Sequence, residues 1–144
     1  MRGLVLMREG MLRTFLPHKS AGDTSVNSAD AAASGGSLSY GNFNAVGDWI
    51  QYTVNVPSAG TYIVSSRVKK HPDRGTAQLY IDGIAQGNSV DQRQSSTNYT
   101  TVSFGEVTFA SPGNKQFRLQ ITGKDPSSNS YTLANDTFSL TKIN

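Results

Sequence analysis

Residues 47–62 read GDWIQYTVNVPSAGTY and carry the clearest structural signal in this 144-residue chain. From residue 50 to residue 56, apolar and polar side chains alternate, which predicts a half-buried β-strand. The parity places Trp49 on the face opposite Ile50 and Tyr52. The sequence Pro-Ser-Ala-Gly at 57–60 then predicts a turn, and a second alternating strand is expected over 62–68.

The same pattern continues to the C-terminus. Further strands are expected over 77–81, from 84, over 99–104, 106–110 and 117–121, and around 138–140. Asp82-Gly83 is typical of a two-residue hairpin turn. Polar loops are expected over 69–75, 87–98 and 123–130, and residues 21–37 favour a loop that could hold one edge strand. Because no helical periodicity follows residue 20, we expect an all-β protein, an antiparallel β-sandwich of the jelly-roll type.

Composition narrows the function classes. The net charge of +3 is carried wholly by residues 1–19, and the remaining chain is neutral, so a nucleic-acid partner is not expected. The chain has no cysteine, which excludes disulfides and thiolate sites. It also has no apolar run long enough to cross a membrane.

Residues 1–20 are expected to be a tail or the remnant of an upstream segment, preceding one domain over 21–144. The apolar run 4–7 is interrupted by Arg8 and Glu9, so it is too short for a secretory signal. Partial helical spacing makes a short docking helix the alternative. We expect the domain to be a monomer.

Catalytic groupings are missing from the sequence pattern. His18 lies in the tail and His71 in a polar loop, and neither has a catalytic partner at a recognisable spacing. We therefore expect no enzymatic activity. A calcium site needs several oxygen ligands, and Asp23, Asp30 and Asp136 are conceivable donors. Ordinary capping or solvation explains these three residues equally well.

Sugars are bound by aromatic rings laid on their C–H faces, with polar side chains around them. Aromatic residues outside the core alternation are therefore candidate contacts. Tyr40 and Phe43 lie in a loop-like polar stretch. Tyr99 and Tyr131 each follow a polar loop, and Trp49 opens a strand. For Trp49 and Tyr99, packing is the favoured interpretation and sugar binding the alternative.

Residues 47–62 resemble the signature of bacterial carbohydrate-binding modules of the family 6, 35 and 16 type. Other parts of the chain resemble the same family, over roughly 30–143: SGG at 34–36, AQLYIDG at 77–83, YTTV at 99–102, PGNKQFRL at 112–119 and NDTFSL at 135–140. The resemblance implies a galactose-binding-like jelly roll that is secreted by bacteria and appended to a glycoside hydrolase or polysaccharide lyase.

The resemblance also implies a sugar cleft in the loops at one end of the sandwich. Phe43 matches one stacking aromatic and Asn135 matches the family's hydrogen-bonding asparagine. Where a second aromatic is expected the chain has Ser96, and Tyr40 or Tyr131 is the substitute. The family's calcium glutamate has no counterpart, and among residues 20–27 only Asp23 is acidic, so any structural calcium would rely on Asp23 and Asp136.

Taken together, the sequence predicts a non-catalytic module that binds a polysaccharide such as β-glucan or xylan and targets an appended secreted enzyme to it. A structural or adhesive spacer without sugar affinity is the first alternative, and a small polysaccharide-active enzyme is the second. The basic loop 69–74, together with Arg93, gives a hint of acidic sugars. A charged loop is more often merely solvated.

Overall fold

A computed structural model describes residues 4–8, 18–19 and 24–144. Apart from a three-residue 3₁₀ turn, Ser34–Gly36, the regular elements are strands. Their bounds are β1 Leu4–Arg8, β2 His18–Lys19, β3 Thr24–Ala29, β4 Ser37–Asn42, β5 Trp49–Val56, β6 Gly60–Lys70, β7 Thr76–Ile81, β8 Ile84–Asp91, β9 Asn98–Phe109, β10 Gly113–Gly123 and β11 Leu133–Lys142.

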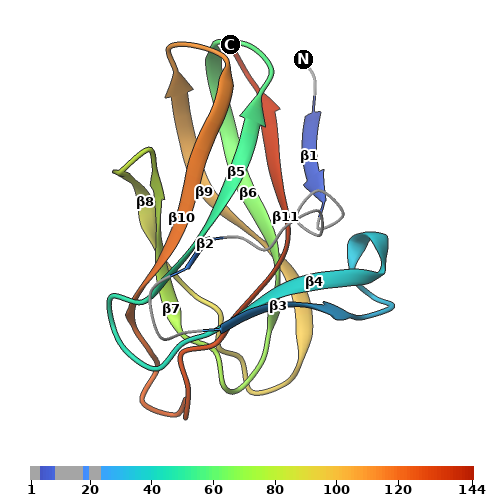
Figure 1. Ribbon diagram of the computed structural model, residues 1–144, viewed down its shortest axis with the longest axis vertical. Helices are drawn as coiled ribbons and strands as arrows, with labels where there is room; N and C mark the ends of the chain where they lie inside the picture. Colours follow the sequence, from blue (N-terminus) through green and yellow to red (C-terminus); the bar gives the residue numbers. More distant parts are fainter. Residues whose placement is uncertain (1–3, 9–17, 20–23) are drawn as a thin grey trace.

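Two antiparallel sheets pack face to face, which confirms the predicted β-sandwich (Figure 1). One sheet has the order β3-β4-β11-β6-β9, with β1 paired to β11, and the other has the order β2-β5-β10-β7-β8. From β4 onward the chain crosses repeatedly between the sheets, as expected of a jelly roll. Within the described ranges, no helix is long and apolar enough to cross a membrane.

The core lies between the sheets and follows the alternation seen in the sequence. Ile50, Tyr52, Val54 and Val56 of β5 are all buried, whereas Thr53 and Asn55 are exposed. Aromatic rings form its centre: Phe138 meets Tyr52 and Phe117 edge to face, with centroids 5.5 and 5.2 Å apart. Such contacts stabilise the sandwich beyond the area they bury.

The predicted hairpin turn is confirmed. Asp82 and Gly83 both have positive φ, 48° and 85°, and Ile81 pairs with Ile84. This is the geometry of a two-residue turn that matches strand twist. The Asp82 carboxylate accepts a hydrogen bond of 2.8 Å from the Gln116 backbone N–H, which fixes the turn against β10.

Some predicted boundaries were wrong. The loop expected over 87–98 is strand up to Asp91, because β8 pairs with β7 at residues 84–86 and again at 90–91, with a shift of register between the two stretches. Residues 99–104 and 106–110 form one strand, β9, whose pairing shifts register beside Gly105, at a φ of 87°.

Two short segments of the expected N-terminal tail, residues 4–8 and 18–19, are strands that pair with the sheets. Leu4–Arg8 forms β1 beside β11, and His18–Lys19 forms β2 beside β5. These two segments therefore extend the sheets, and the alternative of a docking helix is not found for them.

Replacing Phe138 with alanine should lower the free energy of unfolding by about 3–5 kcal/mol, because it removes the ring that joins Tyr52 to Phe117. Urea unfolding followed by circular dichroism measures this loss. Ile84→Ala is the matched control, since Ile84 is 66% exposed and should change stability little. Equal losses in the two variants would contradict this description of the core.

Candidate functional site

Phe43, the predicted stacking aromatic, lies inside the protein. It is 4% exposed and belongs to the main core. Gly41 makes this possible, because a Cβ on Gly41 would lie 2.4 Å from the Phe43 ring. A ring buried under a glycine has no face for a sugar, so the structure corrects the expectation that Phe43 lines the cleft.

Asn135, the predicted hydrogen-bonding asparagine, is also buried, with 2% exposure. Its Nδ2 donates to the Tyr52 hydroxyl at 3.1 Å, and its Oδ1 accepts from Gln92 Nε2 at 3.1 Å. The Tyr52 hydroxyl also bonds Ser39 Oγ at 3.0 Å. Since β5 and β11 belong to different sheets, this network joins the two sheets, and Asn135 has a structural role here.

Tyr99 packs against charged side chains. The Arg67 guanidinium lies 4.1 Å from the centre of the Tyr99 ring, and Lys69 Nζ lies 5.7 Å from it. Burial, followed by the neighbouring Asp30 carboxylate, raises the pKa of Tyr99. The packing interpretation of Tyr99 therefore fits its position better than sugar stacking.

The predicted calcium ligand Asp136 already has positively polarised partners. Its side chain is fully buried, and its oxygens accept from the Ser34 N–H at 3.0 and 3.1 Å and from Arg67 Nη1 at 2.5 Å. The same Nη1 donates to the Ala32 carbonyl at 3.1 Å. The guanidinium thus lies where a cation bound to these oxygens would lie, so the residues around Asp136 do not fit a calcium ion.

The remaining calcium residue of the prediction, Asp23, lies outside the described residues. Asp30, the other conceivable donor, forms an ion pair with Lys69. Within residues 4–8, 18–19 and 24–144, no group of three or more acidic or histidine side chains could hold a metal ion.

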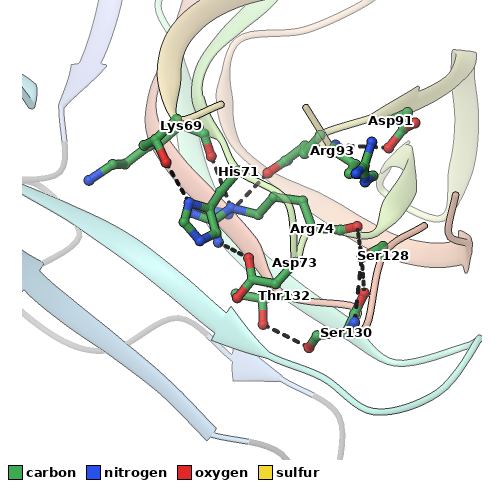
Figure 2. A network of polar contacts seen from close by, with 12 residues as sticks. Lys69, His71, Asp73, Arg74, Asp91, Arg93, Ser128, Ser130 and Thr132 are labelled. Carbon is green, nitrogen blue, oxygen red and sulfur yellow. Dashed lines mark hydrogen bonds and ion pairs between the residues drawn. The ribbon is translucent and has the colours of Figure 1, made fainter. Parts of the chain in front are cut away.

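Tyr40 contributes to a hollow of about 340 Å³ at the loop end, together with Lys69, His71, Asp73, Arg74 and Thr97. Arg74 organises this hollow (Figure 2). It is 3% exposed, its Nε donates to the Lys69 carbonyl at 2.9 Å, and its Nη1 pairs with Asp73. Its guanidinium lies 5.3 Å from the centre of the Tyr40 ring.

The other polar groups around this hollow are also engaged with one another. His71 Nδ1 bonds Thr97 Oγ1 at 2.6 Å. The Arg74 carbonyl accepts from Ser128 Oγ at 2.8 Å, and Ser130 bonds Thr132 through their hydroxyls at 3.1 Å (Figure 2). These bonds hold the loops around 71–75, 92–97 and 128–132 together, and they occupy the side chains of His71, Ser128, Ser130 and Thr132, whereas Arg93 Nε is buried without a hydrogen-bond partner among the described residues.

Tyr131 is half-buried against the main core, with Lys124 Nζ 5.7 Å from its ring centre. It does not line the hollow that contains Tyr40. Tyr40 and Tyr131 therefore do not line one common hollow.

A second hollow, of about 320 Å³, lies on the outer face of the β2-β5-β10-β7-β8 sheet. Its lining residues point away from the core because they occupy the odd positions of β5 and the even positions of β10 and β7. Backbone register aligns Gln51, Arg118 and Tyr80 in one row across these three strands. Gln120 and Gly83 complete the lining, and we call these five residues the sheet-face hollow.

Arg118 at the centre of this hollow is held from two sides. Its guanidinium lies 3.8 Å from the centre of the Trp49 ring, and its Nε donates to Gln51 Oε1 at 3.0 Å. Gln51 in turn contacts Gln116 at 3.4 Å. Among the described residues, the two terminal amino groups of Arg118, the Gln120 amide and the Tyr80 hydroxyl have no side-chain partner.

Sequence reasoning missed all five lining residues, and it kept the neighbouring Trp49 as a sugar contact only as an alternative. The signal was present in the alternation, which places Gln51 beside Trp49 on the outer face. The pairing of β10 with β5 and β7, which brings Arg118 and Tyr80 together, comes from distant parts of the chain.

Comparison with known proteins gives one family and several relatives. The sequence model of carbohydrate binding module (family 6) matches residues 18–142. The chain is 35% identical over 85 residues to beta-agarase AgaA of Microbulbifer thermotolerans, covering 57% of this chain and 20% of that protein. The chain thus spans only a small part of that relative.

Two solved structures resemble the fold. A Paenibacillus xanthan lyase matches with a TM-score of 0.82 and 38% identity, over 89% of this chain and 12% of the lyase. The C-terminal CBM6 of LamC, a marine laminarinase from Zobellia galactanivorans, matches with a TM-score of 0.61 and 19% identity. This match covers 97% of this chain and 100% of that domain. The second match supports the fold alone.

Replacing Arg67 with alanine should lower the free energy of unfolding by about 3 kcal/mol, because it leaves the buried Asp136 carboxylate without its cation. Thermal unfolding measures the loss, and adding EDTA to the wild type should leave the midpoint unchanged. A midpoint that falls with EDTA and is restored by calcium would contradict this account of Asp136.

Stability should fall in alkaline solution through Tyr52. Burial raises the pKa of this hydroxyl from 10.0 to about 12, so the folded protein holds the proton more tightly than the unfolded chain. The stability that the protonated Tyr52 hydroxyl contributes is complete below pH 10 and is lost as the pH rises towards 12. Urea unfolding between these pH values should show a shallower fall for Tyr52→Phe than for the wild type, and identical slopes would contradict the assignment.

Proposed function

Because the chain belongs to family 6 of the carbohydrate-binding modules, whose members bind sugars without catalysis, we propose that it holds a polysaccharide in the sheet-face hollow. The observation that carries this choice is the set of polar groups around Arg118 that lack side-chain partners in the described structure. Sugar hydroxyls need such donors and acceptors.

The loop-end hollow is less suited to a sugar. Its cations are paired with Asp30 and Asp73, and its histidine is bonded to Thr97. A sugar there would have to break these contacts before making its own. Phe43 and Asn135, which the family resemblance assigns to that cleft, are buried.

The shape of the sheet-face hollow also fits a saccharide. Its volume of about 320 Å³ lies within the usual range of small-ligand sites. The half-buried Tyr80 ring lies along one side and offers an aromatic surface. The turn residue Gly83 has nothing within 4 Å of the position a Cβ would take, so that edge is open to a longer chain.

A role in targeting follows from the relatives. The agarase and the xanthan lyase are much longer than this chain, which matches 20% and 12% of them. We therefore propose that the module belongs to a secreted polysaccharide-degrading enzyme and keeps it on its substrate. A polysaccharide-active enzyme would need free carboxylates, but those of Asp48 and Asp136 are occupied by backbone N–H groups and by Arg67.

Affinity electrophoresis tests the site. The panel is xanthan, agarose, xylan, β-1,3-glucan, mannan and pectin. The wild type should be retarded by at least one polysaccharide, and Tyr80→Ala and Gln120→Ala should each weaken that retardation about tenfold, because each removes a contact worth about a kcal/mol or more.

The matched controls are Tyr40→Ala and His71→Ala in the loop-end hollow, which should bind as the wild type does. Circular dichroism establishes that each variant is folded. If the loop-end variants lose binding and the sheet-face variants keep it, the site is at the loop end. If no polysaccharide retards the wild type, the chain is a spacer without sugar affinity.

A further inference from the structure

We infer that the sugar bound in the sheet-face hollow carries a carboxylate, which Arg118 holds through its two terminal amino groups. This inference rests on the proposed function and specifies the class of ligand. It is argued from the chemistry of Arg118 and from the charges around it.

The first step concerns which edge of the guanidinium is available. Gln51 Oε1 accepts from Nε at 3.0 Å, which uses the side edge of the group. The end edge, with both terminal nitrogens, has no partner among the described residues and lies at the hollow. Two parallel N–H groups at this edge match the two oxygens of a carboxylate, which is the strongest pairing that arginine makes.

The second step concerns electrostatics. The ion pairs of the described residues are Arg67 with Asp136, Lys69 with Asp30, and Arg74 with Asp73. Arg118 has no carboxylate within 4.0 Å among the described residues, so none of their acidic side chains neutralises its charge. Its neighbours in the hollow, Gln51, Tyr80 and Gln120, are neutral.

The third step concerns preorganisation. The Trp49 ring lies 3.8 Å from the guanidinium carbon, and Gln51 is itself bonded to Gln116. Arg118 is therefore oriented before any ligand arrives, which lowers the entropic cost of binding. A guanidinium over the indole also covers that ring face, so Trp49 acts here as a positioning residue for Arg118.

The neutral neighbours of Arg118 can then bind the hydroxyls of the same sugar. Once a carboxylate is paired with Arg118, the Gln120 amide and the Tyr80 hydroxyl lie on the same face to meet ring hydroxyls. A uronic acid unit combines both kinds of group on one ring. A neutral sugar would leave the desolvated guanidinium without a counter-charge, which is costly.

Carboxyl reduction is the direct test. Polygalacturonate, alginate and every polysaccharide that retards the module in the panel are compared, by affinity electrophoresis, with their carboxyl-reduced forms. The reduced polymer keeps its ring hydroxyls but loses its charge. We expect the affinity to fall at least about tenfold on reduction, because a hydrogen bond to a charged group contributes more binding free energy than a neutral hydrogen bond.

Variants locate the effect. Arg118→Gln should lower the affinity for the acidic polymer by about the same factor and should abolish the difference between the acidic and reduced forms. Arg118→Lys should retain part of the affinity, because lysine keeps the positive charge but lacks the two parallel N–H groups of the guanidinium. Lys70→Gln is the matched control: it removes the same charge at the end of β6, in the other sheet, and should change nothing.

The outcomes separate the two proposals. If Tyr80→Ala weakens binding but carboxyl reduction and Arg118→Gln do not, the hollow binds neutral sugars and this inference is overturned while the site stands. If Lys70→Gln weakens binding as much as Arg118→Gln, the effect is general charge and the inference also fails. If neither acidic nor neutral polymers bind, the proposed function itself is wrong.

Discussion

The two-residue period of β5 is the constraint on which both the core and the proposed site depend. Ile50 and Tyr52 face inward and are fully buried, while Trp49 and Gln51 face outward and hold Arg118. A slip of one residue in the pairing with β10 would exchange these faces and expose the core. The same strand therefore decides which side chains stabilise the sandwich and which can meet a ligand.

The start of β5 is fixed by the residues just before it. Gly47 has a φ of 97°, in the left-handed region that favours glycine. The Asp48 carboxylate accepts from the backbone N–H groups of Asn44 and Ala45 at 3.0 and 3.1 Å. Residues 47–49 thus end a loop and set the register of β5. Trp49 contributes to the proposed ligand site only by supporting the Arg118 guanidinium.

Buried polar contacts join the strands and loops at the loop end of the sandwich. Tyr52, Asn135 and Gln92 link β5, β11 and the loop after β8 by hydrogen bonds among groups that are all within 3% exposure. Each such group would be costly to leave unpaired, so the network is kept as a unit. An asparagine used in this way cannot also turn towards a sugar.

Strand positions were largely predictable from the sequence because they depend on local alternation. The extent of β8 was not, since Gly87, Asn88 and Ser89 have no apolar periodicity and lie at the register shift between the two stretches of β8 that pair with β7. Phe43 was misplaced for a similar reason. Its polar neighbours suggest a loop, but the space above Gly41 and contact with distant core residues bury the ring.

The candidate site also depends on contacts that local alternation in the sequence cannot predict. Alternation alone marks Trp49 and Gln51 as outward-facing, yet a lone outward tryptophan favours either packing or sugar stacking. The register of β10 supplies the missing partner, because it brings Arg118 from about 70 residues away in sequence to Gln51 and Trp49. With the guanidinium over the indole, the aromatic face is no longer a sugar platform but a support for a charge. A charge held in this way selects a sugar by the groups that the sugar carries as well as by its ring shape. The proposed ligand class therefore rests on Arg118 and not on Trp49.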